Sequence, residues 1–173
     1  MKQFNALFVY LPDYQGKPLW IDTFADDAYF GYIPLGQGGT GVLVRPDGQE
    51  LLPIMETSPE ANASATRFEL QVKPNGDVDG KITCMLSGAF DVRARGELKD
   101  ATPIEAEQYF QQSANTIGEG GKSLSFEKTD LTDLSQPVMV TQTFMTPEAG
   151  VAQGNMMIFT IPQTPFDFAQ LPI

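Results

Sequence analysis

The stretch "RFELQVKPNGDVDGKITCMLSG", residues 67–88, decides the fold class of this chain. Its first residues alternate strictly, with Phe68, Leu70 and Val72 on one face and charged or polar residues on the other. A period of two is typical of a β-strand with one buried face. "PNGD" then supplies turn residues, and "GKITCMLSG" again places apolar residues at alternate positions. The stretch therefore predicts a pair of neighbouring strands.

Similar strand-like runs occur on both sides of this pair. Residues 4–11 and 18–22 are rich in β-branched and aromatic residues and flank "PDYQGK", which suits a hairpin loop. "GVLVRPDGQELLPI" predicts a second hairpin with its turn at "RPDG". Three further runs, "SLSFE", "PVMVTQTFM" and "NMMIFTIP", follow later in the chain. We expect a mainly β protein.

One helix is clearly signalled in "TPIEAEQYFQQSANTIGEGG" and is expected over about 102–117. Thr102 and Glu105 form an S/T-x-x-E capping box, and Pro103 stands at the first helical position. Gly118 is placed to end the helix. The residues that share its apolar face at helical spacing are Ala106, Phe110, Ser113, Ala114 and Ile117.

The expected fold is an antiparallel β sandwich carrying one α-helix, preceded by β hairpins. Many short strands around a single helix need a second sheet to bury their apolar faces. We expect hairpins in residues 1–55, a small, polar, proline-bearing linker at 56–66 and a β-rich domain at 67–173. "AFDVRARGELK", residues 89–99, fits either a strand or a short helix.

Composition excludes several classes of function. The net charge of -11 and the pI near 4.2 disfavour nucleic acid or an anionic membrane surface as a partner, because both require a basic surface. No run approaches the ~20 apolar residues of a membrane span. The chain has no histidine, which excludes Ser-His, Cys-His and His-zinc sites within it. Its apolar start is short and interrupted by Asn5, so we interpret it as a strand and not as a signal peptide.

"GQGGTG" matches the dinucleotide pattern G-x-G-x-x-G in Gly36, Gly38 and Gly41. That chemistry needs a helix N-terminus to meet the pyrophosphate, whereas these glycines lead into a predicted strand. We interpret the stretch as a turn.

"NGDVDG" resembles the first half of a calcium loop, with Asn75, Asp77 and Asp79 at alternate positions before Gly80. The carboxylate expected at the twelfth position is replaced by Leu86. We interpret this stretch as a turn too, and expect no metal and no cofactor.

Two further candidates involve acidic and thiol side chains. Asp26 and Asp27 could join Asp22 as a carboxylate cluster, but neighbouring strand side chains point to opposite faces, so solvated loop charges are the preferred interpretation. Cys84 is the only cysteine, so no intramolecular disulfide exists. It lies on an alternating apolar face with no histidine to lower its pKa, so we expect it in the core.

The opening run, "FNALFVYLPDYQGKPLWIDTFADDAYFGYIPLG", resembles the end of the core domain of bacterial transglutaminase-like proteins, which are papain-like cysteine enzymes. In that family a strand with the base histidine in an F-N-H context leads through a glycine turn to W-[LI]-D, and the aspartate orients the histidine. The matching residues are Phe4, Asn5, Trp20, Ile21 and Asp22. "NGDVDGKITCMLSGAF" and "PIEAEQYFQQSANTI" are similar in pattern to the β-rich domain of unknown function that follows this core in envelope proteins of Gram-negative bacteria. The resemblance implies a periplasmic or cell-envelope location.

Departures from the family argue against catalysis. Ala6 stands at the histidine position, and Thr23 and Phe24 replace the usual proline-threonine. The family's nucleophilic cysteine precedes the histidine, whereas Cys84 comes well after Ala6. Without a histidine and cysteine pair no thiolate forms for acyl transfer. We expect no catalytic residue, with Asp22 a relic of the histidine-orienting aspartate and the parent core a pseudoenzyme, unless Ala6 was engineered.

These features predict a non-catalytic accessory or interaction domain of a transglutaminase-like envelope protein. Its expected partner is the N-terminal part of its own longer chain, with protein or glycan as a further partner. The alternative is a carbohydrate- or peptide-binding β-sandwich module, which an exposed patch of Trp20, Tyr14, Tyr29 and Tyr32 would support. A third hypothesis keeps Asp22 in an active site completed by the missing part, and Ala6 argues against it.

Overall fold

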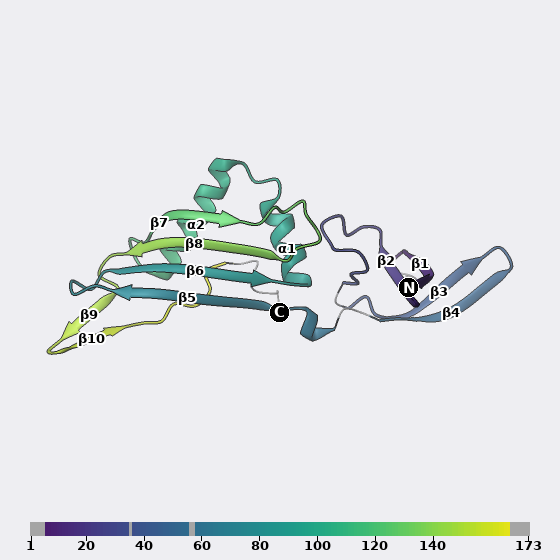
Figure 1. Ribbon diagram of the computed structural model, residues 1–173, viewed down its shortest axis with the longest axis horizontal. Coiled ribbons are helices and arrows are strands. Elements are labelled where there is room, and N and C mark those ends of the chain that lie inside the picture. The colour runs from purple at the N-terminus through teal and green to yellow at the C-terminus, as the bar shows by residue number, and fades with distance from the viewer. Residues whose placement is uncertain (1–5, 35, 56–57, 167–173) are drawn as a thin grey trace, which may run out of the picture.

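A computed structural model describes residues 6–34, 36–55 and 58–166. Two β-hairpins come first, followed by a four-stranded sheet with two helices and then by a third small hairpin (Figure 1). The first two hairpins and the four-stranded sheet lie at opposite ends of an elongated molecule (Figure 1). The described part of the chain is therefore mainly β, as predicted.

The first hairpin joins β1 (Phe8–Tyr14) to β2 (Lys17–Asp22) through a two-residue turn. Gln15 and Gly16 both have positive φ, 55° and 81°, which is the backbone of the tight turns that match strand twist. The predicted loop "PDYQGK" was too long, because Pro12 belongs to β1, next to an irregularity in the strand register.

The second hairpin joins β3 (Gly39–Arg45) to β4 (Gly48–Ile54). Arg45 pairs with Gly48, so the turn consists of Pro46 and Asp47. The prediction of a hairpin turning at "RPDG" is confirmed.

The four-stranded antiparallel sheet has the order β5-β6-β8-β7. Its strands are β5 (Ser64–Val72), β6 (Val78–Leu86), β7 (Lys122–Lys128) and β8 (Val138–Thr146). β5 and β6 are the strand pair that the alternating stretch predicts, and they pair along their whole length.

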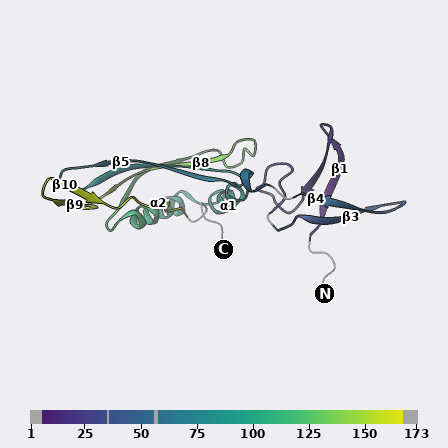
Figure 2. The ribbon, with the colours of Figure 1, turned by 90° about the horizontal axis from the view of Figure 1, so that it is seen from below.

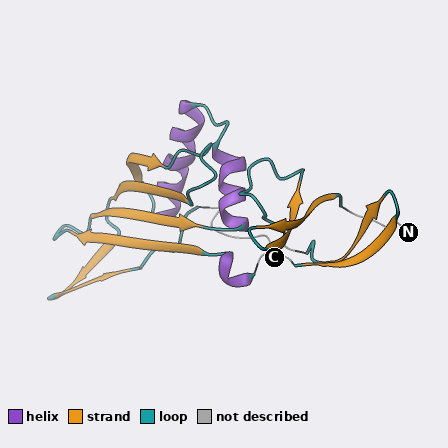
Figure 3. Ribbon diagram, turned by 45° about the vertical axis from the view of Figure 1, so that its right-hand side comes forward, coloured by secondary structure: helices purple, strands orange, loops and turns teal. Residues whose placement is uncertain are grey.

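Two helices cover one face of this sheet, α1 (Ala89–Leu98) and α2 (Pro103–Ile117) (Figures 2 and 3). α2 confirms the predicted helix, because the Thr102 hydroxyl accepts from the Glu105 N–H and the Glu105 carboxylate accepts from the Thr102 N–H. The segment that fitted either a strand or a helix is helical and forms α1.

The core lies between the sheet and the helices. Alternate residues of β6 and β8 that face the helices are buried, except Gly80, which is partly exposed. Ala106, Phe110, Ser113 and Ala114 of the predicted apolar face of α2 are buried too, whereas Ile117 is partly buried. Phe166, from the segment after the last hairpin, packs edge-on against Phe110 at a ring-centroid distance of 5.9 Å. The fully buried aromatic and aliphatic side chains of this core include Phe110, Phe144, Phe166, Ile82, Leu86, Val138 and Val140.

The expectation of one helix is wrong, and the β sandwich is not confirmed. The layer that covers the apolar face of the sheet is helical, so burial of that face needs no second sheet. The opposite face carries mostly polar side chains, which suit an antiparallel sheet with one side in water. Outward positions are held by Arg67, Glu69, Lys81, Thr83, Thr141 and Thr143.

The connection between the hairpins and the sheet is partly regular. A 3-10 turn, η1 (Pro59–Ala61), precedes β5, so regular structure begins inside the range 56–66 that we expect to be a linker. The side-chain oxygen of Asn62 accepts from the backbone N–H of Ala89 at 2.7 Å. This contact caps α1 from a distant part of the chain, since Gly88 supplies no side-chain cap.

A third hairpin follows the sheet and consists of β9 (Gly150–Gln153) and β10 (Met156–Phe159). β10 covers part of the strand predicted in "NMMIFTIP", whereas the sequence patterns missed β9. Among the described residues, no helix has the length and apolar character needed to cross a membrane.

Candidate functional site

A cavity of about 540 Å³ lies between the first two hairpins. Its walls come from the residues at the start of β1, from β3 and β4, and from the glycine-containing stretch before β3. Ala6, Trp20, Gly38 and Gly41 are among the lining residues. Cavities of this size accommodate small ligands or side chains of a partner.

Trp20 ties the two hairpins together. Its indole Nε1 donates to the backbone oxygen of Pro53 on β4 at 3.0 Å. Its ring also packs on Tyr10, with ring centroids 4.6 Å apart. Trp20 is only half-buried, so it combines a structural contact with access to the cavity.

Of the glycines in "GQGGTG", Gly41 has a packing role, whereas a Cβ on Gly36 or Gly39 would meet no atom within 4 Å. A Cβ on Gly41 would lie 3.1 Å from the Trp20 ring and 2.9 Å from the Ile54 side chain, both closer than ordinary contacts. Because β3 starts at Gly39, the stretch leads into a strand and not into a helix. This confirms the interpretation as a turn before a strand and leaves no helix N-terminus for a pyrophosphate.

Asp22 ends β2, opposite Phe8 on β1. Its Oδ1 accepts from the backbone N–H of Phe24 at 2.9 Å. A half-buried carboxylate without an imidazole needs such a partner. Ala6 precedes the first paired residue of β1 and lines the cavity, while Phe4 and Asn5 of the family motif lie outside the described residues.

The aromatic residues around Asp22 do not form one exposed patch. Tyr32 is buried, with 5% of its surface exposed, and contacts Tyr29 at a ring-centroid distance of 5.5 Å. Burial raises the pKa of Tyr32, and the charges of Tyr29 and Asp22 act in the same direction. Tyr14 packs instead against Phe30.

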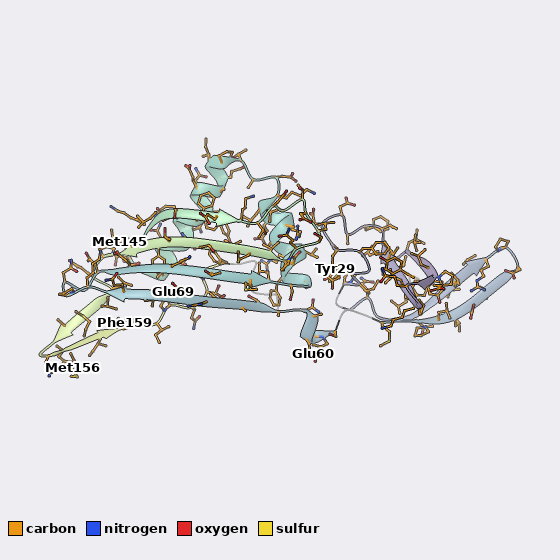
Figure 4. All side chains as sticks on the ribbon, in the orientation of Figure 1. Tyr29, Glu60, Glu69, Met145, Met156 and Phe159 are labelled. Atoms are coloured by element: carbon orange, nitrogen blue, oxygen red, sulfur yellow. The ribbon has the colours of Figure 1, made fainter. Side chains whose placement is uncertain are left out.

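The aspartates that follow β2 serve different local contacts. Asp27 accepts from the Lys99 ammonium at 2.7 Å, and this hydrogen bond raises the pKa of Lys99. The ion pair connects the loop after β2 to the end of α1. Tyr29, in the same loop, lies at the junction between the hairpins and the helical part (Figure 4). The prediction that these aspartates are solvated loop charges holds for Asp26, which is exposed. It is wrong for Asp27, which forms the ion pair with Lys99.

Only the first three residues of "NGDVDG" lie in the turn between β5 and β6. Val78, Asp79 and Gly80 belong to β6, so the predicted turn was too long. Asp77 accepts from the Glu148 N–H at 3.0 Å and from the Asn75 amide at 2.8 Å, and these hydrogen bonds lower the pKa of Asp77. Asp79 pairs with Lys73 at 2.8 Å. Within residues 6–34, 36–55 and 58–166, no three carboxylate or thiol groups are placed to hold a metal ion.

Cys84 lies in the core, as predicted. Its side chain is fully buried on β6, and its sulfur lies 3.5 Å from the Thr66 hydroxyl. Burial raises the pKa of the thiol. β6 belongs to the four-stranded sheet, whereas Asp22 belongs to the hairpins at the other end of the molecule (Figure 1).

No protein-family model, curated protein or solved structure matches this chain. Sequence reasoning identified Trp20 and Asp22 but missed the cavity between the hairpins. The unusual run of apolar residues on both strands of the second hairpin, "GVLV" and "ELLPI", was the available signal.

Proposed function

We propose that the chain is the C-terminal part of a longer, transglutaminase-like protein of the bacterial cell envelope, and that it serves there as a non-catalytic accessory or interaction domain. The first two hairpins form the surface that packs against the preceding core. The resemblance of the opening run to the end of such a core supports this assignment. The missing imidazole and the burial of Cys84 support a role without acyl transfer.

The observation that carries the proposal is the apolar surface of the first two hairpins. A two-stranded hairpin is at best marginally stable by itself in water, and here two such hairpins share only a small contact around Trp20. Large apolar side chains nevertheless remain exposed on them and on the residues that flank their strands. The most exposed are Leu7, Phe24, Val44, Leu51 and Met55, each with at least 69% of its surface accessible. Such a surface indicates an interaction site.

The alternative, a carbohydrate- or peptide-binding module built on these aromatic residues, has less support. Stacking on a sugar needs exposed aromatic faces, and Tyr32 is buried while Trp20 is half-buried against Tyr10. We therefore favour a protein surface over a glycan site at the hairpins.

The test begins with the reading frame upstream of residue 1. We expect it to encode a transglutaminase-like core, and we expect the separately produced core to bind this chain in a calorimetric titration. Val44→Asp, on the exposed hairpin surface, should weaken binding at least about tenfold, because it buries an unpaired charge. Val151→Asp, similarly exposed on β9, is the matched control and should not change the affinity.

Two results would overturn the proposal. One is an upstream frame without such a core, or a core that does not bind. The other is thiol-dependent amide exchange by this chain that Cys84→Ser abolishes, because that result would make the chain catalytic.

A further inference from the structure

β7 is an edge strand of the four-stranded sheet. It pairs with β8 on one side, and none of the described strands pairs with its other side (Figure 1). An edge strand presents backbone N–H and C=O groups that can pair with another chain. Lysine side chains and bulges often protect such edges, and β7 has an exposed Lys122 and an irregular register between Ser123 and Ser125 at its start. Its last residue, Lys128, instead directs its ammonium to the backbone oxygen of Leu98 at 3.0 Å.

A groove of about 850 Å³ runs between β7 and α2. Its helical wall extends from Ile104 to Asn115, which at 1.5 Å per residue is about 17 Å. An extended chain rises about 3.3 Å per residue, so the wall accommodates about five residues of a strand. The groove therefore has the length of a short strand.

The side chain of Gln111 already occupies one position of a missing strand. Its amide nitrogen donates to the Gly121 oxygen at 2.8 Å, and its amide oxygen accepts from the Ser123 N–H at 3.1 Å. The N–H and C=O of one residue in a parallel neighbouring strand would make the same two kinds of hydrogen bond to residues two apart, here Gly121, directly before β7, and Ser123. Among the described residues, no other side-chain amide of α2 bonds to the β7 backbone, so Gln111 covers only the start of this edge.

The residues that line the groove indicate which side chains a bound strand would carry. Leu124 and Ile104 line it with 62% and 67% of their surfaces exposed, so apolar side chains of a bound strand have partners. Glu107 is the only charged residue among those lining it. Together with a net charge of -11, this favours a basic ligand and disfavours a second copy of the chain.

We propose that the groove between α2 and β7 binds an extended basic peptide, which adds to the edge of β7 as a fifth strand. Backbone hydrogen bonds supply the affinity, and alternate side chains contact Leu124 and Glu107. This surface lies on the four-stranded sheet and is independent of the hairpin surface proposed above.

The test uses the whole chain and a fluorescent seven-residue peptide of alternating lysine and valine with blocked ends. Fluorescence anisotropy should detect binding, and methylation of every amide nitrogen of the peptide should abolish it, because the backbone donors are then lost. Leu124→Arg should weaken binding at least tenfold through repulsion and loss of the apolar contact. Val151→Arg, equally exposed on β9, should leave it within twofold.

Amide NMR shifts give a second measurement that does not depend on a variant. On addition of the peptide, the shifts should concentrate on residues 122–128 and leave β5, the opposite edge, unchanged. Absence of binding, equal binding of the methylated peptide, or no effect of Leu124→Arg with a native thermal midpoint would each overturn the proposal. So would a concentration-dependent dimer that Leu124→Arg converts to monomer, because a second copy would then be the occupant.

Discussion

The Asp91 carboxylate and the Arg95 guanidinium, one turn apart on α1, form an ion pair that is almost completely buried. Arg95 Nε donates to Asp91 Oδ1 at 2.6 Å. The two terminal nitrogens of Arg95 donate to the backbone oxygens of Leu131 and Gln136, and Asp91 accepts from the Val138 N–H. The pair thus holds the connection between β7 and β8 against α1.

Removing one member of this pair should be strongly destabilising, because the other charge is left buried without its partner. We expect Arg95→Met to lower the free energy of unfolding by about 3–5 kcal/mol in urea titrations. Arg93→Met is the matched control on the same helix. Its ion pair with Glu97 is about one-third exposed, so its loss should cost less than about 1 kcal/mol. Equal losses for the two variants would contradict the structural role of Arg95.

Two glycines should respond in opposite directions to alanine. Gly96 lies inside α1, and a Cβ there would meet no atom closer than 3.9 Å, so Gly96→Ala should stabilise the chain by about 0.5–1 kcal/mol. On Gly80, in β6, a Cβ would overlap the buried Phe144 ring. Gly80→Ala should therefore cost about 1–3 kcal/mol. Chemical denaturation measures both, and a neutral Gly80→Ala would mean that the ring has room to move.

The helix caps should each contribute measurably. Thr102→Ala removes the capping box of α2, and Asn62→Ala removes the distant cap of α1, so each should cost about 0.5–2 kcal/mol. Thr116→Ala, near the end of α2, provides a control outside the caps and should cost less. An unchanged denaturation midpoint for Thr102→Ala would mean that the helix begins elsewhere.

Cys84 should be unreactive in the folded chain, because its thiol is buried and burial raises its pKa. We expect an aromatic disulfide reagent at pH 8 to label it about 100-fold more slowly than in urea. Below the unfolded thiol's pKa of about 8.5, the raised pKa contributes its full stabilisation to the folded chain. This contribution is lost as the pH rises through the pKa of the thiol in the folded chain. Fast labelling without denaturant would contradict core burial.

Restoring the histidine of the family motif tests whether Asp22 is a relic. In Ala6→His, the carboxylate of Asp22 should raise the histidine pKa above the ordinary value of about 6.5, as measured by NMR titration. Asp22→Asn in the same background should remove the shift. Leu51→His, exposed on β4, serves as the reference for a histidine away from Asp22. If the histidine pKa is unshifted and Asp22→Asn does not change it, Asp22 is an ordinary residue at the end of a strand.

The sequence by itself determined the elements whose signals are local. Strict alternation in β5 and β6, the turn at Pro46 and Asp47, and the Thr102 capping box each depend on neighbouring residues, and each is present as predicted. The core position of Cys84 follows from the same alternation, because a period of two assigns each side chain to a face.

Only the tertiary structure decided what covers each face. The segment that forms α1 has no clear apolar stripe, because its core-facing positions include Asp91 and Arg95. These two charged side chains can be buried only because backbone groups near Leu131 and Val138 complete their hydrogen bonds. Those partners lie about 40 positions away in sequence, so no local pattern could identify α1. For the same reason, no local pattern could show that helices cover the apolar face of the sheet in place of a second sheet. The cavity at Trp20 and the groove beside β7 have the same origin, since both arise where elements distant in sequence meet.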